Sequence, residues 1–594
     1  MIADPLALLW PRPQRIARLP GAWTPDLARP RQNPAQSASL RPEGYRLRAD
    51  RDGVAVEAAD EAGARHAART IDQVLRLSRE RTSIPAFEIE DWPDFPRRGV
   101  LLDVSRGKVP RMETLLALVD RLAGLKIDEL QLYTEHAFAY AGHEEVWRDA
   151  SPIAPDEVRA LDRFCTERGI DLVPNQQSLG HMHRWLGLDR YRTLAEVPEG
   201  IEHAFSLKRE PFGLCPTDAA VPAFLADLYD QLLPCFSSRF FDVGLDEAID
   251  LGAGRSKAAC EEIGKGRVYL RFLERVHRLA LERGRRIQFW ADGILEHADI
   301  ASEVPQDAIP LVWGYEADHP FAEQARAVAR HGHEFYVCPG TSSWQSIAGR
   351  VRNAAANLAG AAREGLAAGA TGYLVADWGD RGHLQPPFAS LPGFLLGAGF
   401  AWNVSSASDP ALDLRALLGA HAFEDPEGTL PAVALELGDL YLESGCASTN
   451  GSALFFLLAF ASEPLPHARM PGLSVEGLER ALAALARSRA RLHGARGSPA
   501  ASGHVADEMT WAADLLAFAC RLGIARLRSD PGAPISALPD ADRRRLANEL
   551  EPLVPQHRRG WLLRNRPGGL AEAAGWLERP LRALRGGLSG SIPV

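Results

Sequence analysis

Two adjacent carboxylates, Asp246 and Glu247, are the residues whose types and position most clearly suggest chemistry. They follow an apolar run, Phe240–Leu245, that is typical of a buried strand. Successive side chains at a strand end point in different directions, so the pair could serve two roles in one pocket. Burial and like charge would raise the pKa of at least one of them, as a general acid near neutral pH requires. We expect one group to bind substrate and the other to transfer a proton.

An adjacent Asp-Glu pair is also common on solvated surfaces. Whether this pair indicates an active site therefore depends on the secondary structure around it. Between Arg98 and about Asn403, short apolar runs alternate with longer segments of helical spacing. Strands buried on both faces are typical of a parallel sheet covered by helices. The expected strands are Gly99–Val104, Glu129–Thr134, Asp171–Pro174, Phe240–Leu245, Gln288–Trp290, Pro310–Trp313, Glu334–Cys338 and Gly372–Ala376. The expected helices include Arg111–Leu125, Pro155–Arg168, Asp218–Cys235, Gly266–Arg283, Pro320–His331 and Ala354–Ala368.

Eight such strands over about 300 residues favour a closed (β/α)₈ barrel, the TIM barrel. The alternative is an open doubly wound sheet, which calls for a Gly-rich phosphate turn after an early strand, and the sequence offers none. The expected fold class is therefore α/β. We expect a small α/β domain at 1–93, the catalytic barrel at 94–404 and an α-helical domain at 405–594. Within the last, Gly494–Gly503 reads as a loop and Arg585–Val594 as a Gly/Ser-rich tail.

Polar and aromatic residues follow the expected strands, where a barrel of this type carries its chemistry. Four tryptophans stand at or just beyond successive strand ends: Trp290, Trp313, Trp344 and Trp378. Branched aliphatic residues usually fill a barrel, whereas flat aromatic faces suit the apolar faces of a sugar or an acetyl methyl. The alternative is that these tryptophans simply cap the barrel core.

The overall composition excludes some classes of partner. The net charge is −10 and no dense Lys/Arg run occurs, which argues against nucleic-acid binding. No run of about 18 apolar residues is present, so we expect no membrane span. The seven cysteines form no CxxC pair and read as reduced thiols. The first residues make a poor signal peptide because Pro11 and Pro13 cut the apolar stretch short. We expect a cytoplasmic protein.

Several motifs together resemble glycoside hydrolase family 20, the β-N-acetylhexosaminidases. Arg98–Arg106 is similar to the family's first barrel strand, and Val173–His181 to its third-strand segment ending in Gly-His. Val243–Glu247 resembles its Gly-Gly-Asp-Glu signature. Leu214–Thr217, Trp290–Asp292, Trp313 and Trp378–Asp380 match further family segments. The resemblance covers residues 1 to about 403, including the small domain before the barrel.

The resemblance implies a substrate-assisted mechanism, in which the acetamido oxygen of the sugar attacks its own anomeric carbon and gives an oxazolinium intermediate. Asp246 would orient the acetamido group, and Glu247 would act as acid and then base. Members of the family retain anomeric configuration and use no metal or other cofactor. The remaining roles implied are sugar hydroxyl binding by Arg98 and Asp380, enclosure of the acetyl methyl by Trp290, Trp313 and Trp378, and support of Glu247 by His181.

The chain also departs from the family pattern. Glu135-His136 stands where the family has an Asp-Asp pair, so Glu135 is the candidate partner of His181. The family tyrosine that donates to the acetamido oxygen is replaced near Trp344. Asp242, Leu245 and Asn175 also differ from the residues common in the family. These changes leave open whether the sugar is N-acetylglucosamine or N-acetylgalactosamine, and whether it is modified at C6.

Other functions remain open from the sequence. His181-Met182-His183 could begin a zinc site and make the protein a metal-dependent hydrolase. The barrel could instead bind sugar without catalysis, or transfer the sugar to an acceptor other than water. The expected partner is an N-acetylhexosamine-containing glycan or glycoside, with no nucleic acid and no membrane, and the helical domain could support a homodimer.

Overall fold

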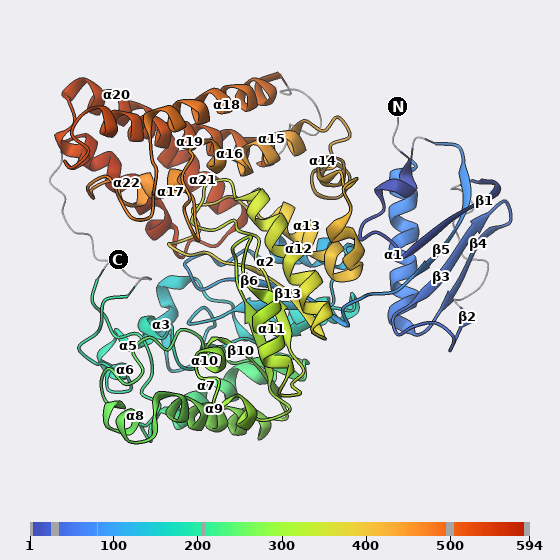
Figure 1. Cartoon of the computed structure of the whole chain (residues 1–594), viewed down its shortest axis with the longest axis horizontal. Coiled ribbons are helices and arrows are strands. Elements are labelled where there is room, and N and C mark those ends of the chain that lie inside the picture. Colours follow the sequence, from blue (N-terminus) through green and yellow to red (C-terminus); the bar gives the residue numbers. More distant parts are fainter. Residues whose placement is uncertain (1–3, 25–34, 80, 204–207, 495–503, 587–594) are drawn as a thin grey trace.

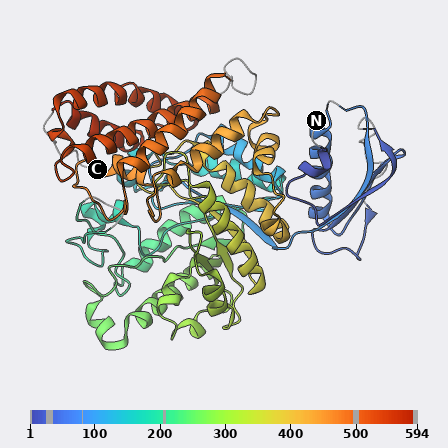
Figure 2. The ribbon, with the colours of Figure 1, turned by 45° about the horizontal axis from the view of Figure 1, so that its top comes forward.

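The computed structural model describes residues 4–24, 35–79, 81–203, 208–494 and 504–586. A small sheet domain, a barrel and a bundle of helices follow one another along the chain (Figure 1). The sheet domain lies at one side of the barrel and the C-terminal helices at another (Figures 1 and 2). Most of the expected loop Gly494–Gly503 and of the expected tail Arg585–Val594 lies outside the described residues.

The N-terminal domain is a sheet of order β1-β5-β3-β4-β2 with α1 packed on it. Its elements are β1 (Arg15–Trp23), β2 (Ala35–Gln36), β3 (Tyr45–Asp50), β4 (Gly53–Ala58), α1 (Glu61–Leu77) and β5 (Ile84–Asp91). Buried residues alternate with more exposed ones along β3, and the Gly63 N–H donates to the side chain of Asp60, the N-cap of α1. The pairing of β1 with β5 shifts register between Arg18 and Ala22, around Pro20 and Gly21.

The expected eight-stranded parallel barrel is confirmed. Its strands lie in the order β8-β7-β6-β13-β12-β11-β10-β9, and every pair between neighbours is parallel. They are β6 (Arg97–Asp103), β7 (Glu129–Tyr133), β8 (Asp171–Val173), β9 (Phe240–Asp242), β10 (Arg286–Trp290), β11 (Ile309–Trp313), β12 (Tyr336–Cys338) and β13 (Gly372–Asp377).

The barrel closes between β8 and β9 through a single parallel bridge rather than a full ladder. Asn175 pairs with Asp242 just beyond the end of β8. The Gln176 N–H donates to the Asp242 carbonyl at 3.0 Å, and the Asp242 N–H donates to the Pro174 carbonyl at 2.9 Å. The closure therefore lies at the carboxyl ends of these short strands, beside the segment that carries Asp246.

Helices surround the barrel as the sequence predicted, together with others that it did not predict. The longer ones are α2 (Met112–Gly124), α4 (Pro155–Glu167), α7 (Val221–Leu232), α8 (Lys257–Ile263), α9 (Lys265–Leu281), α11 (Phe321–Ala329), α12 (Val351–Ala367) and α13 (Leu391–Trp402). Between β10 and β11 the longest helix is the short α10 (Asp292–Glu296). No helix was predicted at α13, which is apolar on all sides and buried from Pro392 to Trp402. Such a segment shows no amphipathic period.

The C-terminal region is helical. Its elements are α14 (Leu414–Leu418), α15 (Thr429–Gly438), α16 (Leu440–Glu443), α17 (Ala453–Ala459), α18 (Val475–Gly494), α19 (His504–Arg528), α20 (Asp540–Leu550), α21 (Leu553–Arg564) and α22 (Leu570–Leu584). Its apolar side chains belong to the same buried cluster as the outer layer of the barrel. Among the described residues, no helix combines the length and apolar character that crossing a bilayer would need.

Candidate active site

The chain turns sharply between β9 and the two carboxylates. β9 ends at Asp242, and φ is positive at Gly244 (72°), Leu245 (71°) and Glu247 (48°). The expectation that the strand continues to Leu245 and sends the two carboxylates in different directions is therefore wrong. The turn instead brings both side chains toward His181.

His181 contacts both carboxylates through one nitrogen. Its Nε2 atom lies 3.0 Å from Glu247 Oε2 and 3.4 Å from Asp246 Oδ2. Burial alone would lower the pKa of His181, but the charge of Asp246 and hydrogen bonds with both carboxylates raise it to about 10. His181 therefore carries a proton at neutral pH and supplies positive charge between the two carboxylates.

Asp246 is the more firmly held of the pair. The Gln177 side-chain amide donates to Asp246 Oδ1 at 2.7 Å. A Cβ at Gly244 would come within 1.9 Å of the Gln177 side chain, so only glycine leaves room for this contact. Burial would raise the pKa of Asp246, but the charge of His181 and these hydrogen bonds outweigh it and lower that pKa. Asp246 is therefore held ionised.

The backbone of Glu247 is held by a hydrogen bond, whereas its side chain is more exposed than that of Asp246. Its N–H donates to Asp292 Oδ2 at 2.8 Å, and the Trp313 indole donates to Asp292 Oδ1 at 3.3 Å. Burial and the nearby charge of Asp246 raise the pKa of Asp292 to about 8. The side chain of Glu247 is 31% exposed, against 11% for Asp246, so Glu247 has the easier access to solvent.

Glu135 lies on the far side of His181, where the sequence placed a candidate partner. Its Oε1 atom is 3.9 Å from His181 Nδ1 and accepts a hydrogen bond of 3.1 Å from the Tyr133 hydroxyl. Arg106 Nε lies 3.5 Å from the same Oε1 atom. Burial raises the pKa of Glu135, although Arg106 and His181 oppose this shift.

Arg98 does not reach the site, and its expected contact with sugar hydroxyls is wrong. Arg98 lies near the amino end of β6, at the end of the barrel opposite the carboxylates, and its side chain is fully buried. Its guanidinium pairs with Glu43 at 2.7 Å and Asp128 at 2.8 Å. The ion pair with Glu43 joins the barrel to the N-terminal domain.

Arg106 occupies the position at the mouth that was assigned to Arg98. It follows the carboxyl end of β6, lies 3.3 Å from Asp103 Oδ2, and covers the rings of Tyr133 and Trp378. The sequence does contain a signal for this difference. Arg98 precedes the apolar run of the strand and Arg106 follows it, so Arg106 is the one at the carboxyl end, where a barrel carries its chemistry.

The four tryptophans meet at the mouth, mostly as buried side chains. Trp290 and Trp344 are 1% exposed and Trp378 is 7% exposed. They belong to one cluster that fills the upper barrel, on which the partly exposed Trp313 packs. Trp313 also stacks on Tyr315, with ring centroids 5.4 Å apart. The burial of Trp290, Trp344 and Trp378 favours, for these three, the alternative interpretation that they cap the barrel core. With Trp313 and Tyr315 they form an apolar wall, which the bond from Trp313 to Asp292 connects to the carboxylate pair.

The C-terminal region completes the rim of the mouth. The Trp344 indole donates to the Asn450 side chain at 2.7 Å, and the Ser452 N–H donates to the Gln345 carbonyl at 2.8 Å. The Gln345 side chain in turn lies 3.4 Å from Asp380. Asn450 lies far along the chain from the barrel strands, and no motif in the sequence connects it with them.

One group of side chains has the spacing of a metal site. His181, Asp246 and Glu247 each offer one ligand atom, and these atoms lie within 4.8 Å of one another. This set contains the first histidine of the H-x-H motif. His183, the second histidine of that motif, is half-buried, and desolvation lowers its pKa well below the ordinary value.

The sequence matches two family descriptions that cover most of the N-terminal domain and barrel. Residues 14–92 match "Glycosyl hydrolase family 20, domain 2". Residues 95–350 match "Glycosyl hydrolase family 20, catalytic domain". The second match includes the carboxylate pair, His181 and Arg106.

Individual relatives are distant. A beta-hexosaminidase of Porphyromonas gingivalis is 26% identical over 231 residues, which are 35% of this chain and 29% of that protein. A beta-hexosaminidase of Vibrio furnissii is 24% identical over 352 residues, which are 51% of this chain and 53% of that protein. The chain thus spans about half of these relatives or less. The fold is similar to that of Flavobacterium johnsoniae chitobiase, with a TM-score of 0.59 and 15% identity over 91% of this chain and 96% of that one.

Proposed function

Because this chain belongs to glycoside hydrolase family 20, we propose that it is an exo-acting, retaining β-N-acetylhexosaminidase. It removes a terminal N-acetylglucosamine or N-acetylgalactosamine from a glycan or glycoside. The observation that carries this proposal is the shared contact of His181 with Asp246 and Glu247 beside an aromatic wall. The relatives named beta-hexosaminidase support the same class of substrate.

The two carboxylates differ in a way that suits substrate-assisted catalysis. The acetamido oxygen attacks the anomeric carbon, the glycosidic bond breaks, and the leaving oxygen takes a proton. Asp246, kept ionised by His181 and Gln177, would stabilise the positive charge that develops on the acetamido nitrogen. Glu247, the more exposed group, would give its proton to the leaving oxygen and then take one from water.

Arg106 and Asp380 would bind the outer hydroxyls of the sugar. Arg106 carries donors in a planar fork, and Asp103, Glu135 and the rings of Tyr133 and Trp378 hold it at the mouth. Contacts of this kind at the outer end of the pocket would leave no room for a further sugar there, which fits removal of a terminal unit.

Tyr315 is the candidate for the acetamido contact that the sequence left without a residue near Trp344. It stacks on Trp313 and packs edge-on against Trp344, at ring-centroid distances of 5.4 and 5.1 Å. Burial raises the pKa of Tyr315 well above its ordinary value, and the charge of Asp246 adds to this shift. Its hydroxyl therefore stays protonated and could donate to the acetamido oxygen.

A metal-dependent hydrolase is the second candidate, because His181, Asp246 and Glu247 could each give a metal one ligand. The two candidates differ in what removal of metal would do. Hydrolysis of p-nitrophenyl β-glycosides of N-acetylglucosamine, N-acetylgalactosamine and glucose, with and without EDTA, separates them.

Release from an N-acetyl substrate alone, unchanged by EDTA, is the expected result. Loss of activity in EDTA that zinc restores would favour the metal-dependent alternative. Binding of a thiazoline inhibitor without release of nitrophenol would indicate a sugar-binding barrel or one that needs another acceptor.

A further inference from the structure

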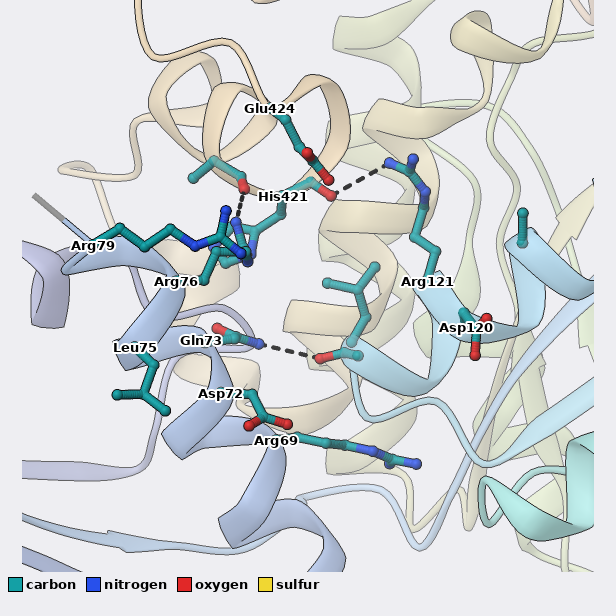
Figure 3. A pocket seen from close by; sticks show the side chains of 14 residues that line it. Arg69, Asp72, Gln73, Leu75, Arg76, Arg79, Asp120, Arg121, His421 and Glu424 are labelled. Atoms are coloured by element: carbon teal, nitrogen blue, oxygen red, sulfur yellow. Dashed lines mark hydrogen bonds between the residues drawn. The ribbon is translucent and has the colours of Figure 1, made fainter. Parts of the chain in front are cut away.

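A cleft of about 710 Å³ lies at the end of the barrel away from the catalytic mouth. It lies between α1 of the N-terminal domain, the last turns of α2 and the π-helical turn Gly419–Phe423 that follows α14. Figure 3 shows the side chains of these three segments pointing toward one another across the cleft. The end of α2 precedes the start of β7, which places the cleft at the amino ends of the strands.

Four arginines line this cleft: Arg69 and Arg76 from α1, Arg79 just beyond the end of α1, and Arg121 from α2. Arg76 donates to the carbonyl of Ala420 and, at 3.0 Å, to Nδ1 of His421. Arg121 donates to the carbonyl of Ala422 at 2.7 Å. These are neutral acceptors, so they fix the two guanidinium groups without neutralising them.

The cleft holds fewer available carboxylates than arginines. Within the part of the chain that the structure describes, no carboxylate oxygen lies within 4.0 Å of a side-chain nitrogen of the four arginines. Three acidic residues line the same cleft, and one of them, Asp120, is paired with Arg168. Asp72 and Glu424 remain, and only Glu424 is close enough to Arg76 and Arg121 to raise their pKa values.

His421 adds no charge to the cleft, because burial lowers its pKa to about 4. Burial also lowers the pKa of Arg69, to about 10, and those of Arg76 and Arg121. This local excess of positive charge stands in a chain whose net charge is −10. A bound anion would supply the negative charge that balances the arginines.

We propose that this cleft binds the phosphate group of a small phosphate ester. Planar guanidinium forks match phosphate oxygens and give short, charge-assisted hydrogen bonds. The arginines come from both sides of the cleft, so one phosphate group can contact α1 and α2 together. The volume leaves room for a sugar-sized body beside the phosphate. The bound ligand would tie the N-terminal domain to the barrel and the C-terminal helices.

Titration calorimetry on the full chain tests this proposal with glucose 6-phosphate, inorganic phosphate and glucose at constant ionic strength. Glucose 6-phosphate lacks an N-acetyl group and so does not mimic the substrate of the catalytic pocket. Calorimetry is preferred to melting curves because phosphate stabilises many proteins by exclusion from their surface. We expect saturable binding of glucose 6-phosphate and none of glucose. Inorganic phosphate should bind more weakly, and if it binds equally well the site takes free phosphate.

The variants locate the site. Arg76→Gln combined with Arg121→Gln should weaken glucose 6-phosphate binding by about tenfold or more. Arg79→Gln, at an exposed residue beyond the end of α1, should weaken it by about threefold without changing the fold. Glu424→Gln should tighten binding, because it removes a competing carboxylate. Arg330→Gln, on the exposed end of α11, is the matched control and should change nothing. Absence of binding, or equal binding by all variants, would overturn the proposal.

Discussion

The Nε2 atom of His181 lies 3.0 Å from Oε2 of Glu247, the residue assigned here as acid and base. The same atom lies 3.4 Å from Asp246. One protonated imidazole therefore interacts with two carboxylates. When one carboxylate is protonated or binds substrate, the imidazole can interact more strongly with the other. When Glu247 is protonated to act as the acid, the positive charge of His181 can still pair with the negative charge of Asp246. His181 is thus a positioning residue that links the states of the pair.

Glu247→Gln should remove the acid while keeping the size of the side chain. With an unactivated leaving group, such as the second sugar of chitobiose, we expect kcat/KM to fall by about 10²- to 10⁴-fold. With a p-nitrophenyl leaving group, which departs without full protonation, the loss at the first step should be smaller. Steady-state kinetics on both substrates measures the difference, and Glu282→Gln on the exposed end of α9 is the matched control. An unchanged rate with chitobiose would disprove this role for Glu247.

Asp246→Asn should lower kcat with both kinds of leaving group. In the proposed mechanism its carboxylate stabilises charge on the acetamido group, and an activated leaving group does not supply that interaction. Loss of one such preorganised charge usually costs about 10²- to 10³-fold in kcat. A variant that stayed fully active on p-nitrophenyl substrates, while folding normally, would contradict the assignment.

Arg106 and Arg98 should behave oppositely on substitution. Arg106→Lys keeps the charge but loses the planar fork, so we expect a higher KM for the N-acetyl substrate and little change in thermal stability. Arg98→Met removes the buried guanidinium that pairs with the half-buried Glu43 and with Asp128, and breaking a buried ion pair in this way typically costs up to about 3–5 kcal/mol of the free energy of unfolding.

Melting temperature and KM, measured together, separate these two effects. Because Arg98→Met could fail to fold, Glu43→Gln provides a milder test of the same ion pair. If Glu43→Gln raised KM without lowering the melting temperature, the structural role of Arg98 would be wrong.

The pH dependence of stability should reveal the protonated state of His181. Its pKa is about 10 in the folded protein, against 6.5 for an unperturbed histidine. A raised pKa contributes stability that is complete below about pH 6.5 and is lost as the pH rises through about 10. Over that range, the free energy of unfolding of the wild-type protein should fall more steeply than that of His181→Gln.

Urea denaturation at several pH values measures both slopes. Asp292, whose pKa is raised to about 8, titrates in the same range in both proteins, so the difference between the slopes reports on His181. Parallel slopes would mean that His181 carries no extra proton.

The sequence predicts the barrel well because apolar strand runs and amphipathic helices leave clear patterns. It fails where those patterns are missing, as in α13, which is apolar on every side. The expected role of Arg98 is wrong because this residue lies at the amino end of β6, whereas the carboxylate pair lies at the carboxyl ends of the strands. The contacts of Asn450 with the mouth depend on tertiary packing alone, so no local signal could have predicted them.

The sharpest measurement compares p-nitrophenyl N-acetyl-β-glucosaminide with its N-trifluoroacetyl analogue. Fluorine makes the amide oxygen a poorer nucleophile but changes the shape of the group little. If the substrate's own amide attacks the anomeric carbon, kcat/KM should fall by about tenfold or more with the fluorinated compound, a loss of at least about 1.4 kcal/mol in transition-state stabilisation. Equal rates for the two compounds would contradict the substrate-assisted mechanism and require a nucleophile from the protein or from water.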